Sequence, residues 1–201
     1  MVILEKSYNS TTTIPIDSKL FEMGHVFIEN EITSESADAI KKQIMYLVYK
    51  SSADKPIYIH INSLGGDINA GLVLYDIIQD YADRIYLVCT GRACSLAAVL
   101  LACGKKGRRF MLPNSEVMIH EPLISNQISG NCSSIKATSM RLVSIKEKMN
   151  KILASHTGKS LQEIDEATSF DNYLNAQEAV NLGIVDKIIS FKEVMEGNID
   201  V

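Results

Sequence analysis

The sequence has little of what nucleic-acid-binding, membrane-spanning or secreted proteins require. Its largest clusters of basic residues are the pairs Lys105-Lys106 and Arg108-Arg109, and its net charge is −4. A surface for nucleic acid or anionic lipid is therefore not expected. The longest apolar run, Leu96 to Cys103, is far too short to cross a bilayer. Because the N-terminal apolar run breaks off at Glu5, before it could serve as a signal peptide, we expect a cytoplasmic protein.

Metal-binding patterns and linkers are also missing from the sequence. The four cysteines, Cys89, Cys94, Cys103 and Cys132, lack metal-ligand spacing and fall mostly within apolar runs. This indicates reduced thiols, and neither a metal nor an organic cofactor is expected. The 201 residues contain no internal repeat and no low-complexity linker. Residues 1–201 are therefore predicted to form a single domain.

The first half of the chain alternates strand and helix patterns. Residues 1–20 are polar and β-branched around Asn9 to Thr13, and are predicted to form a mobile arm or loop. Strand patterns at 26–28, 57–62 and 85–89 then alternate with helical patterns at 33–48 and 72–78. This succession indicates right-handed crossovers on a largely parallel sheet. The predicted fold class is α/β.

The second half contains the longest predicted helix, from Cys132 to His156, which Gly158 ends. Its apolar positions drift around more than one face, so part of this helix is expected to pack against another subunit. A polar extended stretch at 124–131 precedes it. The remaining patterns are strands at 109–112, 117–120 and 184–189 and helices at 161–167 and 176–182.

Ser95 stands between a buried strand and a helix rich in small residues. Ala93 and Ala97 flank it two residues away on either side, which matches the steric requirement of a nucleophile elbow, where bulky neighbours do not fit. The following helix directs backbone N–H groups toward the serine, where they would stabilise an oxyanion. The alternative is an ordinary serine N-cap at the start of a core helix.

A serine nucleophile needs a base and an orienting acid. Among the four histidines, His25 and His156 lie in polar surroundings, and His60 lies on the alternate face of its strand. His120 ends an apolar strand, so its ring is expected at the carboxyl edge of the sheet, where α/β proteins place their sites. Asp171, between two helices, is the candidate acceptor for the His120 Nδ1–H. Alternatively, His120 is an ordinary strand-end histidine and Asp171 a helix cap.

Five ordered motifs resemble the ClpP family, the proteolytic subunits of ATP-dependent Clp proteases, and indicate a divergent member. The resemblance spans nearly the whole chain, from the Met1 arm, which resembles the family's axial loop, to Ile189. The motifs are Asn62-Ser63-Leu64-Gly65-Gly66, Gly91 to Ala98, Leu112 to Ser115 with Met118 to Leu123, His156-Thr157-Gly158, and Asp171 to Ala179.

The resemblance implies a serine endopeptidase in which Ser95, His120 and Asp171 are nucleophile, base and acid. It also implies oxyanion donors at the backbone N–H groups of Gly66 and Leu96. A glycine lets the backbone approach a substrate closely, and Leu96 directly follows the nucleophile. The implied architecture is the ClpP/crotonase-like fold of repeated ββα units. Residues 1–20 would be the axial arm and residues 122–158 the handle region, whose helix projects between rings.

The same resemblance implies a homo-oligomeric tetradecamer of stacked heptameric rings that receives unfolded polypeptides from AAA+ Clp unfoldases. In the family's docking pocket, Tyr58 and Ile189 match, whereas His60 replaces a Tyr and Asp80 stands where an apolar residue is usual. An acidic group there is costly to cover with an apolar loop unless it is paired or protonated. Weak docking of standard unfoldases is therefore expected, and a ClpP paralogue is a further candidate partner.

Further departures from the family pattern concern assembly. Leu64 replaces a Pro, Ile124-Ser125 replaces a Gly-Gly pair, and Phe170 replaces an Arg that makes ring-to-ring ionic contacts. The expected function is hydrolysis of peptide bonds in unfolded proteins through an acyl-enzyme. One alternative is a specialised or regulatory ring subunit that acts with a more typical ClpP paralogue. A weaker alternative is a crotonase-type acyl-CoA enzyme, which the serine, histidine and aspartate set disfavours.

Overall fold

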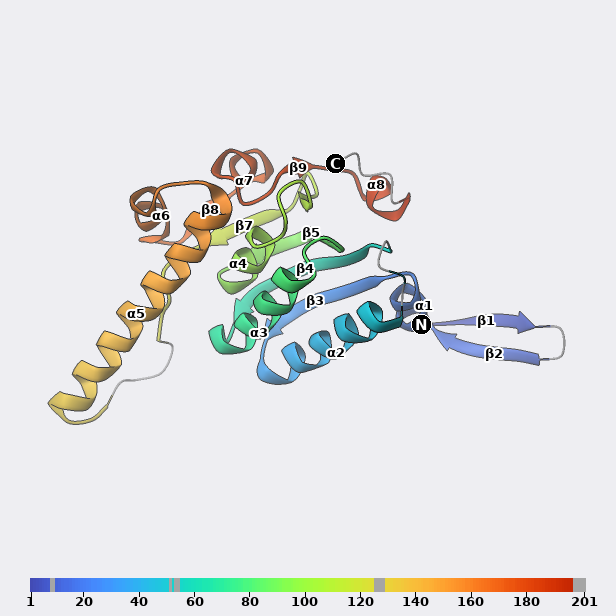
Figure 1. Ribbon diagram of the computed structural model, residues 1–201, viewed down its shortest axis with the longest axis horizontal. Coiled ribbons are helices and arrows are strands. Elements are labelled where there is room, and N and C mark those ends of the chain that lie inside the picture. Colours follow the sequence, from blue (N-terminus) through green and yellow to red (C-terminus); the bar gives the residue numbers. More distant parts are fainter. Residues whose placement is uncertain (8–9, 51, 53–54, 125–128, 197–201) are drawn as a thin grey trace.

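The computed structural model describes residues 1–7, 10–50, 52, 55–124 and 129–196. These residues form nine strands and eight helices (Figure 1). The strands are β1 (Val2–Ser7), β2 (Ser10–Pro15), β3 (His25–Ile32), β4 (Ile57–Gly66), β5 (Ile85–Cys94), β6 (Arg109–Met111), β7 (Glu116–Ile119), β8 (Asn172–Leu174) and β9 (Lys187–Ile188). The helices are α1 (Ile16–Glu22), α2 (Ser34–Lys50), α3 (Ile68–Asp80), α4 (Leu96–Ala102), α5 (Cys132–Thr157), α6 (Leu161–Thr168), α7 (Ala176–Leu182) and α8 (Phe191–Glu196).

A mainly parallel sheet forms the centre of the molecule. Its strands follow the order β3-β4-β5-β6-β9, all parallel, and helices α2, α3 and α4 cover one face (Figure 1). The later part of β5 also pairs in parallel with β7, to which β8 adds an antiparallel strand. The α/β fold predicted from the alternating patterns is confirmed, and it is consistent with the ClpP-family fold.

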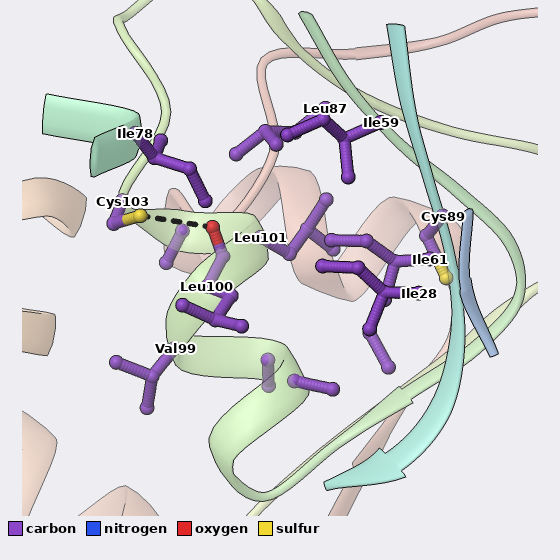
Figure 2. Packing of buried hydrophobic residues seen from close by; sticks show 14 of the residues in the cluster. Ile28, Ile59, Ile61, Ile78, Leu87, Cys89, Val99, Leu100, Leu101 and Cys103 are labelled. Atoms are coloured by element: carbon purple, nitrogen blue, oxygen red, sulfur yellow. Dashed lines mark hydrogen bonds between the residues drawn. The ribbon is translucent and has the colours of Figure 1, made fainter. Parts of the chain in front are cut away.

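The core lies between this sheet and the helices on that face. Alternate residues of neighbouring strands point the same way because the strand period is two, and Ile28, Ile61 and Leu87 are thereby gathered on one face. Leu100 and Leu101 of α4 pack against them (Figure 2). All five side chains are almost completely buried. Burying each contributes about 1.5–3 kcal/mol, so this layer holds the strand ends in fixed positions.

The N-terminal segment, which its composition predicted to be an arm or a loop, contains regular secondary structure. Strands β1 and β2 pair as an antiparallel hairpin, with Leu4 opposite Thr13, and the hairpin extends away from the body (Figure 1). Helix α1 follows directly and leads into β3. The β-branched residues Thr11 to Thr13 favour a strand, but their polar side chains gave no alternating apolar signal. Residues 8 and 9 lie outside the described part of the chain.

Helix α5 projects from the sheet, as predicted, and its bounds are confirmed to within one residue (Figure 1). Gly158 ends the helix in the left-handed conformation at φ 76°. Its buried residues are Met149, Asn150 and Leu153, near its C-terminal end, whereas apolar residues nearer its N-terminus, such as Met140, are exposed. Residues 125–128 of the predicted extended stretch lie outside the described chain. None of the described helices combines the length and apolar character needed to cross a membrane.

The C-terminal region contains elements that the sequence did not predict. Strand β8 and helix α8 are both short, and the strand expected at 184–189 is reduced to β9. Ile184 and Val185 are buried, but they follow the left-handed Gly183 that ends α7 and pack without strand pairing. A run of apolar residues signals burial more reliably than it signals a strand.

Candidate active site

Ser95 lies on a strained turn between β5 and α4. Its φ and ψ are 54° and −123°, a positive φ that residues other than glycine adopt rarely. The flanking Ala93 and Ala97 are fully buried, so larger side chains would not fit there. Ser95 occupies the N-cap position of α4, but its hydroxyl makes no capping hydrogen bond to the helix, which argues against an ordinary capping role. The backbone N–H of Ser95 instead donates to the Met118 carbonyl at 2.7 Å, which holds the turn against β7.

His120 bridges the serine and the aspartate. Its Nε2 lies 2.9 Å from the Ser95 Oγ, and its Nδ1 lies 3.1 Å from an Asp171 carboxylate oxygen. In the tautomer with the proton on Nδ1, the ring donates to Asp171 and accepts from the serine hydroxyl. The structure thus brings together the three residues that the sequence proposed as nucleophile, base and acid. Asp171 is 60% exposed in the single chain.

Strand pairing explains why these distant residues meet. β5 pairs in parallel with β7 so that Cys94 lies beside Met118. Ser95 and His120 follow shortly after these two residues, so both emerge at the same end of the sheet. β8 pairs with β7 so that Asn172 lies opposite Ile119, which places Asp171 next to His120. The sequence indicated a connection between two helices at Asp171 and gave no signal for β8. Three residues are too few to show the alternation that identifies a strand.

A buried polar network, which the sequence did not predict, holds the segment directly after His120. The backbone N–H of Glu121 donates to the Thr168 carbonyl at 2.7 Å. The Thr168 hydroxyl donates to the Asn150 side chain at 3.3 Å, and Asn150 donates to Asp165 at 3.1 Å. The network joins α5 and α6 to the residue that follows His120. Its signal in the sequence was weak, because a lone asparagine within a helix more often faces solvent.

Gly65 and Gly66, the last two residues of β4, form a turn on the other wall of the site. Gly65 has φ 95°, and a Cβ there would lie 2.7 Å from the Cys94 carbonyl and 3.1 Å from the Leu96 nitrogen. Gly66 has φ 150°, and a Cβ there would lie 2.2 Å from the Ile32 carbonyl. Both positions therefore require glycine. The turn packs directly against the N-terminus of α4, where backbone N–H groups have no partner within the helix.

A groove of about 530 Å³ runs past the serine and the histidine. Beside it a small recess opens between α4, α5 and the residues that follow β7. The groove is lined by Glu31, Leu64, Gly66, Asp67, Ile68, Asn69, Ser95, Met118, His120, Pro122, Leu123 and Ile145. Ser95 and His120 also line the recess, whose other walls are mainly apolar: Ile68, Leu96, Val99, Ile119, Pro122, Met149 and Leu153. The nucleophile therefore faces an open channel with an apolar side pocket.

The four residues assigned to partner docking lie in two places. Tyr58 and Ile189 belong to one buried cluster, and His60 lies on the same face of β4 as Tyr58. That face is opposite the one that α3 covers. Asp80 is the last residue of α3 and is exposed. Within one chain the structure thus groups three of the four residues and leaves Asp80 in solvent.

The other histidines are not in polar surroundings, and this expectation for His25 and His156 is wrong. His25 and His60 are both buried and share a hydrogen bond of 2.9 Å between Nδ1 and Nε2. Burial lowers the pKa of His25, and burial together with the neighbouring His25 lowers the pKa of His60 to about 4. His156 is hydrogen-bonded to the Tyr75 hydroxyl at 3.0 Å, and burial lowers its pKa as well. All three are structural groups, which leaves His120 as the histidine beside the serine.

The cysteines show the environments expected for thiols. Cys89, Cys94 and Cys103 are buried, and burial raises the pKa of each, that of Cys89 to about 11. Cys132 is exposed at the start of α5. Within the described residues no group of three or more His, Cys, Asp or Glu side chains could hold a metal ion.

Serine hydrolases use this arrangement, in which a histidine contacts a serine on one side and an aspartate on the other. Here it lies at the edge of an α/β sheet. Comparison with known families is consistent with that class: the sequence model of the Clp protease family matches residues 8–192, nearly the whole length. The chain belongs to the Clp protease family. Membership makes it a ClpP-like peptidase.

Proposed function

We propose that the protein is a serine endopeptidase, the proteolytic subunit of an ATP-dependent Clp-type protease. The observation that carries the proposal is the position of His120, whose ring nitrogens lie within hydrogen-bonding distance of both Ser95 and Asp171. Serine is a weak nucleophile unless a neighbouring base accepts its proton. His120, held by the Asp171 carboxylate through its other ring nitrogen, can accept the serine proton.

In the proposed mechanism, the Ser95 Oγ attacks the carbonyl carbon of the scissile bond while His120 Nε2 accepts the serine proton. Asp171 stabilises the imidazolium that forms. The backbone N–H groups of Gly66 and Leu96 are proposed as donors to the oxyanion, because the glycine turn packs against the start of α4 beside Ser95. His120 then gives its proton to the leaving amine, which releases the first product and leaves an acyl-enzyme. A water molecule, activated by His120, hydrolyses the ester and restores the serine.

The proposed substrates are unfolded polypeptides. The groove is open along its length and contains Ser95 within its lining, so an extended chain can lie across the nucleophile. The apolar recess has a volume of only about 20 Å³, so it would receive at most a small side chain next to the cleaved bond. An internal peptide bond of a folded domain would have to lie in an extended segment before it could enter this groove.

For the assembly we propose stacked heptameric rings, with α5 forming contacts between them. This agrees with the exposed apolar residues Ile135, Met140 and Val143 toward the N-terminal end of α5. An AAA+ Clp unfoldase is the proposed source of unfolded chains. Its docking on the homomeric ring is proposed to be weak, because Asp80 and His60 replace apolar or aromatic residues in the pocket the family uses.

A second function is favoured by one further observation. Phe170 stands beside Asp171 and is 84% exposed, at the position where the family has an arginine for contact between rings. An aromatic residue cannot make that ionic contact. This favours a specialised ring subunit that assembles with a more typical ClpP paralogue, and mixed rings formed on co-expression would support it.

Hydrolysis of an unfolded protein tests the proposed function directly. The purified protein should cleave an unfolded, fluorescently quenched polypeptide and a short fluorogenic peptide, and Ser95→Ala should cleave neither. The native mass of the same preparations reports whether the rings form, so that loss of chemistry is separated from loss of assembly. Hydrolysis by Ser95→Ala at the wild-type rate would contradict the proposal.

A further inference from the structure

Strand β3 carries a distortion next to the proposed active site. Glu29 pairs with Asn62 of β4, but the register then shifts and Glu31 pairs with Gly65. At the shift, Asn30 adopts φ 64°, a left-handed conformation. Such bulges redirect side chains and are frequent beside active sites.

The buried Ser63 fastens this bulge to the glycine turn. Its hydroxyl donates to the Asn30 carbonyl and accepts from the Gly65 N–H, which lies 3.1 Å away. Ser63 is almost completely buried, so neither contact competes with water. The bulge and the turn therefore form one rigid unit, and the position of Glu31 is coupled to that of Gly65.

The consequence is that Glu31 reaches the substrate groove and Glu29 does not. Glu31 lines the groove together with Ser95 and His120. Glu29 lines only the adjoining hollow on the far side of Leu64 and Gly66, into which Glu31 also faces. Since Glu31 pairs with Gly65, and Gly65 packs against Ser95, only one strand separates the carboxylate from the nucleophile.

The charged residues that line the groove are acidic. Among the described residues, its lining contains two carboxylates, those of Glu31 and Asp67, and neither Lys nor Arg. Asp67 is engaged as the N-cap of α3, where its carboxylate accepts from the Ala70 N–H at 2.8 Å. Arg92 lines the adjoining hollow, but among the described residues it makes no ion pair with Glu31. Asp67 keeps its charge, but its carboxylate is held at the start of α3, whereas among the described residues no hydrogen bond or ion pair holds the carboxylate of Glu31. Glu31 is therefore the carboxylate of the groove that can turn toward a substrate.

We propose that Glu31 is a specificity-determining residue that favours peptides with a lysine or arginine close to the cleaved bond. The inference rests on the proposed peptidase function and names the substrate class for it. An extended peptide advances about 3.3 Å per residue, so a long basic side chain a few residues from the scissile carbonyl can reach a carboxylate one strand away. Glu31 is exposed, so the pair would form in a solvated setting and remain modest in strength.

The test uses fluorogenic peptides that are neutral except for one lysine, moved one position at a time along either side of the cleaved bond. A matched series carries norleucine or glutamate instead of lysine. For the best lysine position, kcat/KM should exceed that of the norleucine peptide by about two- to fivefold, the range of an exposed ion pair. Glu31→Gln should abolish this preference, and Glu31→Lys should transfer it to the glutamate peptide. Raising the salt concentration should shrink the preference in the wild type.

Glu29→Gln and Glu29→Lys are the matched controls, because Glu29 is exposed on the same strand but lies outside the groove. They should leave the lysine preference equal to that of the wild type. Equal effects at both positions would show a general field of the protein and overturn the role of Glu31. The role of Glu31 would also be overturned if Glu31→Lys hydrolysed the neutral peptide fully and still preferred the lysine peptide. That result would not contradict the peptidase function. Absence of any Ser95-dependent hydrolysis in the wild type would overturn both proposals.

Discussion

The buried pair of His25 and His60 should make the protein lose stability in mild acid. Both rings lie on the face of the sheet opposite the main core, where His60 stacks on Phe27 with ring centroids 4.8 Å apart. Their environment favours the neutral rings, because burial lowers both pKa values. In the unfolded chain each histidine returns to a pKa of about 6.5.

The sign and size of the effect follow from the two pKa values of His60. Above about pH 6.5 the ring is neutral in both states, and its contribution to stability is complete. As the pH falls from there toward about 4, the unfolded chain takes up a proton that the folded chain does not, so the free energy of unfolding decreases. Between about pH 7.5 and about pH 5, a shift from 6.5 to about 4 removes roughly 2 kcal/mol. His25 adds to the loss in the same direction.

Urea unfolding followed by circular dichroism at one protein concentration measures this loss. We compare the wild type with His60→Phe, which keeps an aromatic ring on Phe27 and removes the titrating group. Between the two pH values, the wild type should lose about 2 kcal/mol more than His60→Phe. Phe27→Leu is the control, since it disturbs the same stack and should shift stability equally at both pH values. The same pH dependence in His60→Phe and in the wild type would refute the reasoning.

Three further perturbations have defined outcomes. Asp171→Asn should lower kcat by about 10²–10⁴-fold with little change in KM, because it disturbs the tautomer of His120 and spares the nucleophile; unchanged turnover in steady-state assays would show that the acid is misplaced. Arg109→Met should cost about 3–5 kcal/mol in urea unfolding, because it leaves the carboxylate of Asp186 unpaired in a mostly buried site, and adding Asp186→Leu should recover part of that loss. Asp80→Phe should strengthen unfoldase binding and ATP-driven protein degradation while peptide cleavage stays the same, and efficient degradation by the unmodified ring with an ordinary unfoldase would contradict this expectation.

The parts of the fold that sequence predicted are those with a repeating apolar signal. Strands β4 and β5 carry runs of mostly buried residues and helix α2 buries one face, and the existence and order of all three were confirmed. The elbow at Ser95 was predictable because its steric demand falls on near neighbours in the chain. Strand β8 and the β1–β2 hairpin were not, because one is too short and the other too polar to show a period.

The long-range features of the site were beyond sequence reasoning for a different reason. The contact between Asn150 and Thr168, the pairing of His25 with His60, and the bulge at Asn30 all depend on which strands and helices become neighbours. A local sequence pattern does not indicate which distant segment will lie beside a residue in the fold. The positive φ of Asn30 has a weak local signal, since asparagine tolerates that conformation better than most residues.

The central claim is that Ser95 is a nucleophile activated by His120, and a fluorophosphonate probe tests it most directly. Intact mass and peptide mapping of the treated wild type should show one adduct per chain, on Ser95. Ser95→Ala should form none while keeping the native mass and thermal unfolding of the wild type, since the side chain makes no capping contact with α4. The neighbouring Cys94 should not react, because burial raises the pKa of its thiol. An adduct that persists in Ser95→Ala, on Cys94 or elsewhere, would contradict the account.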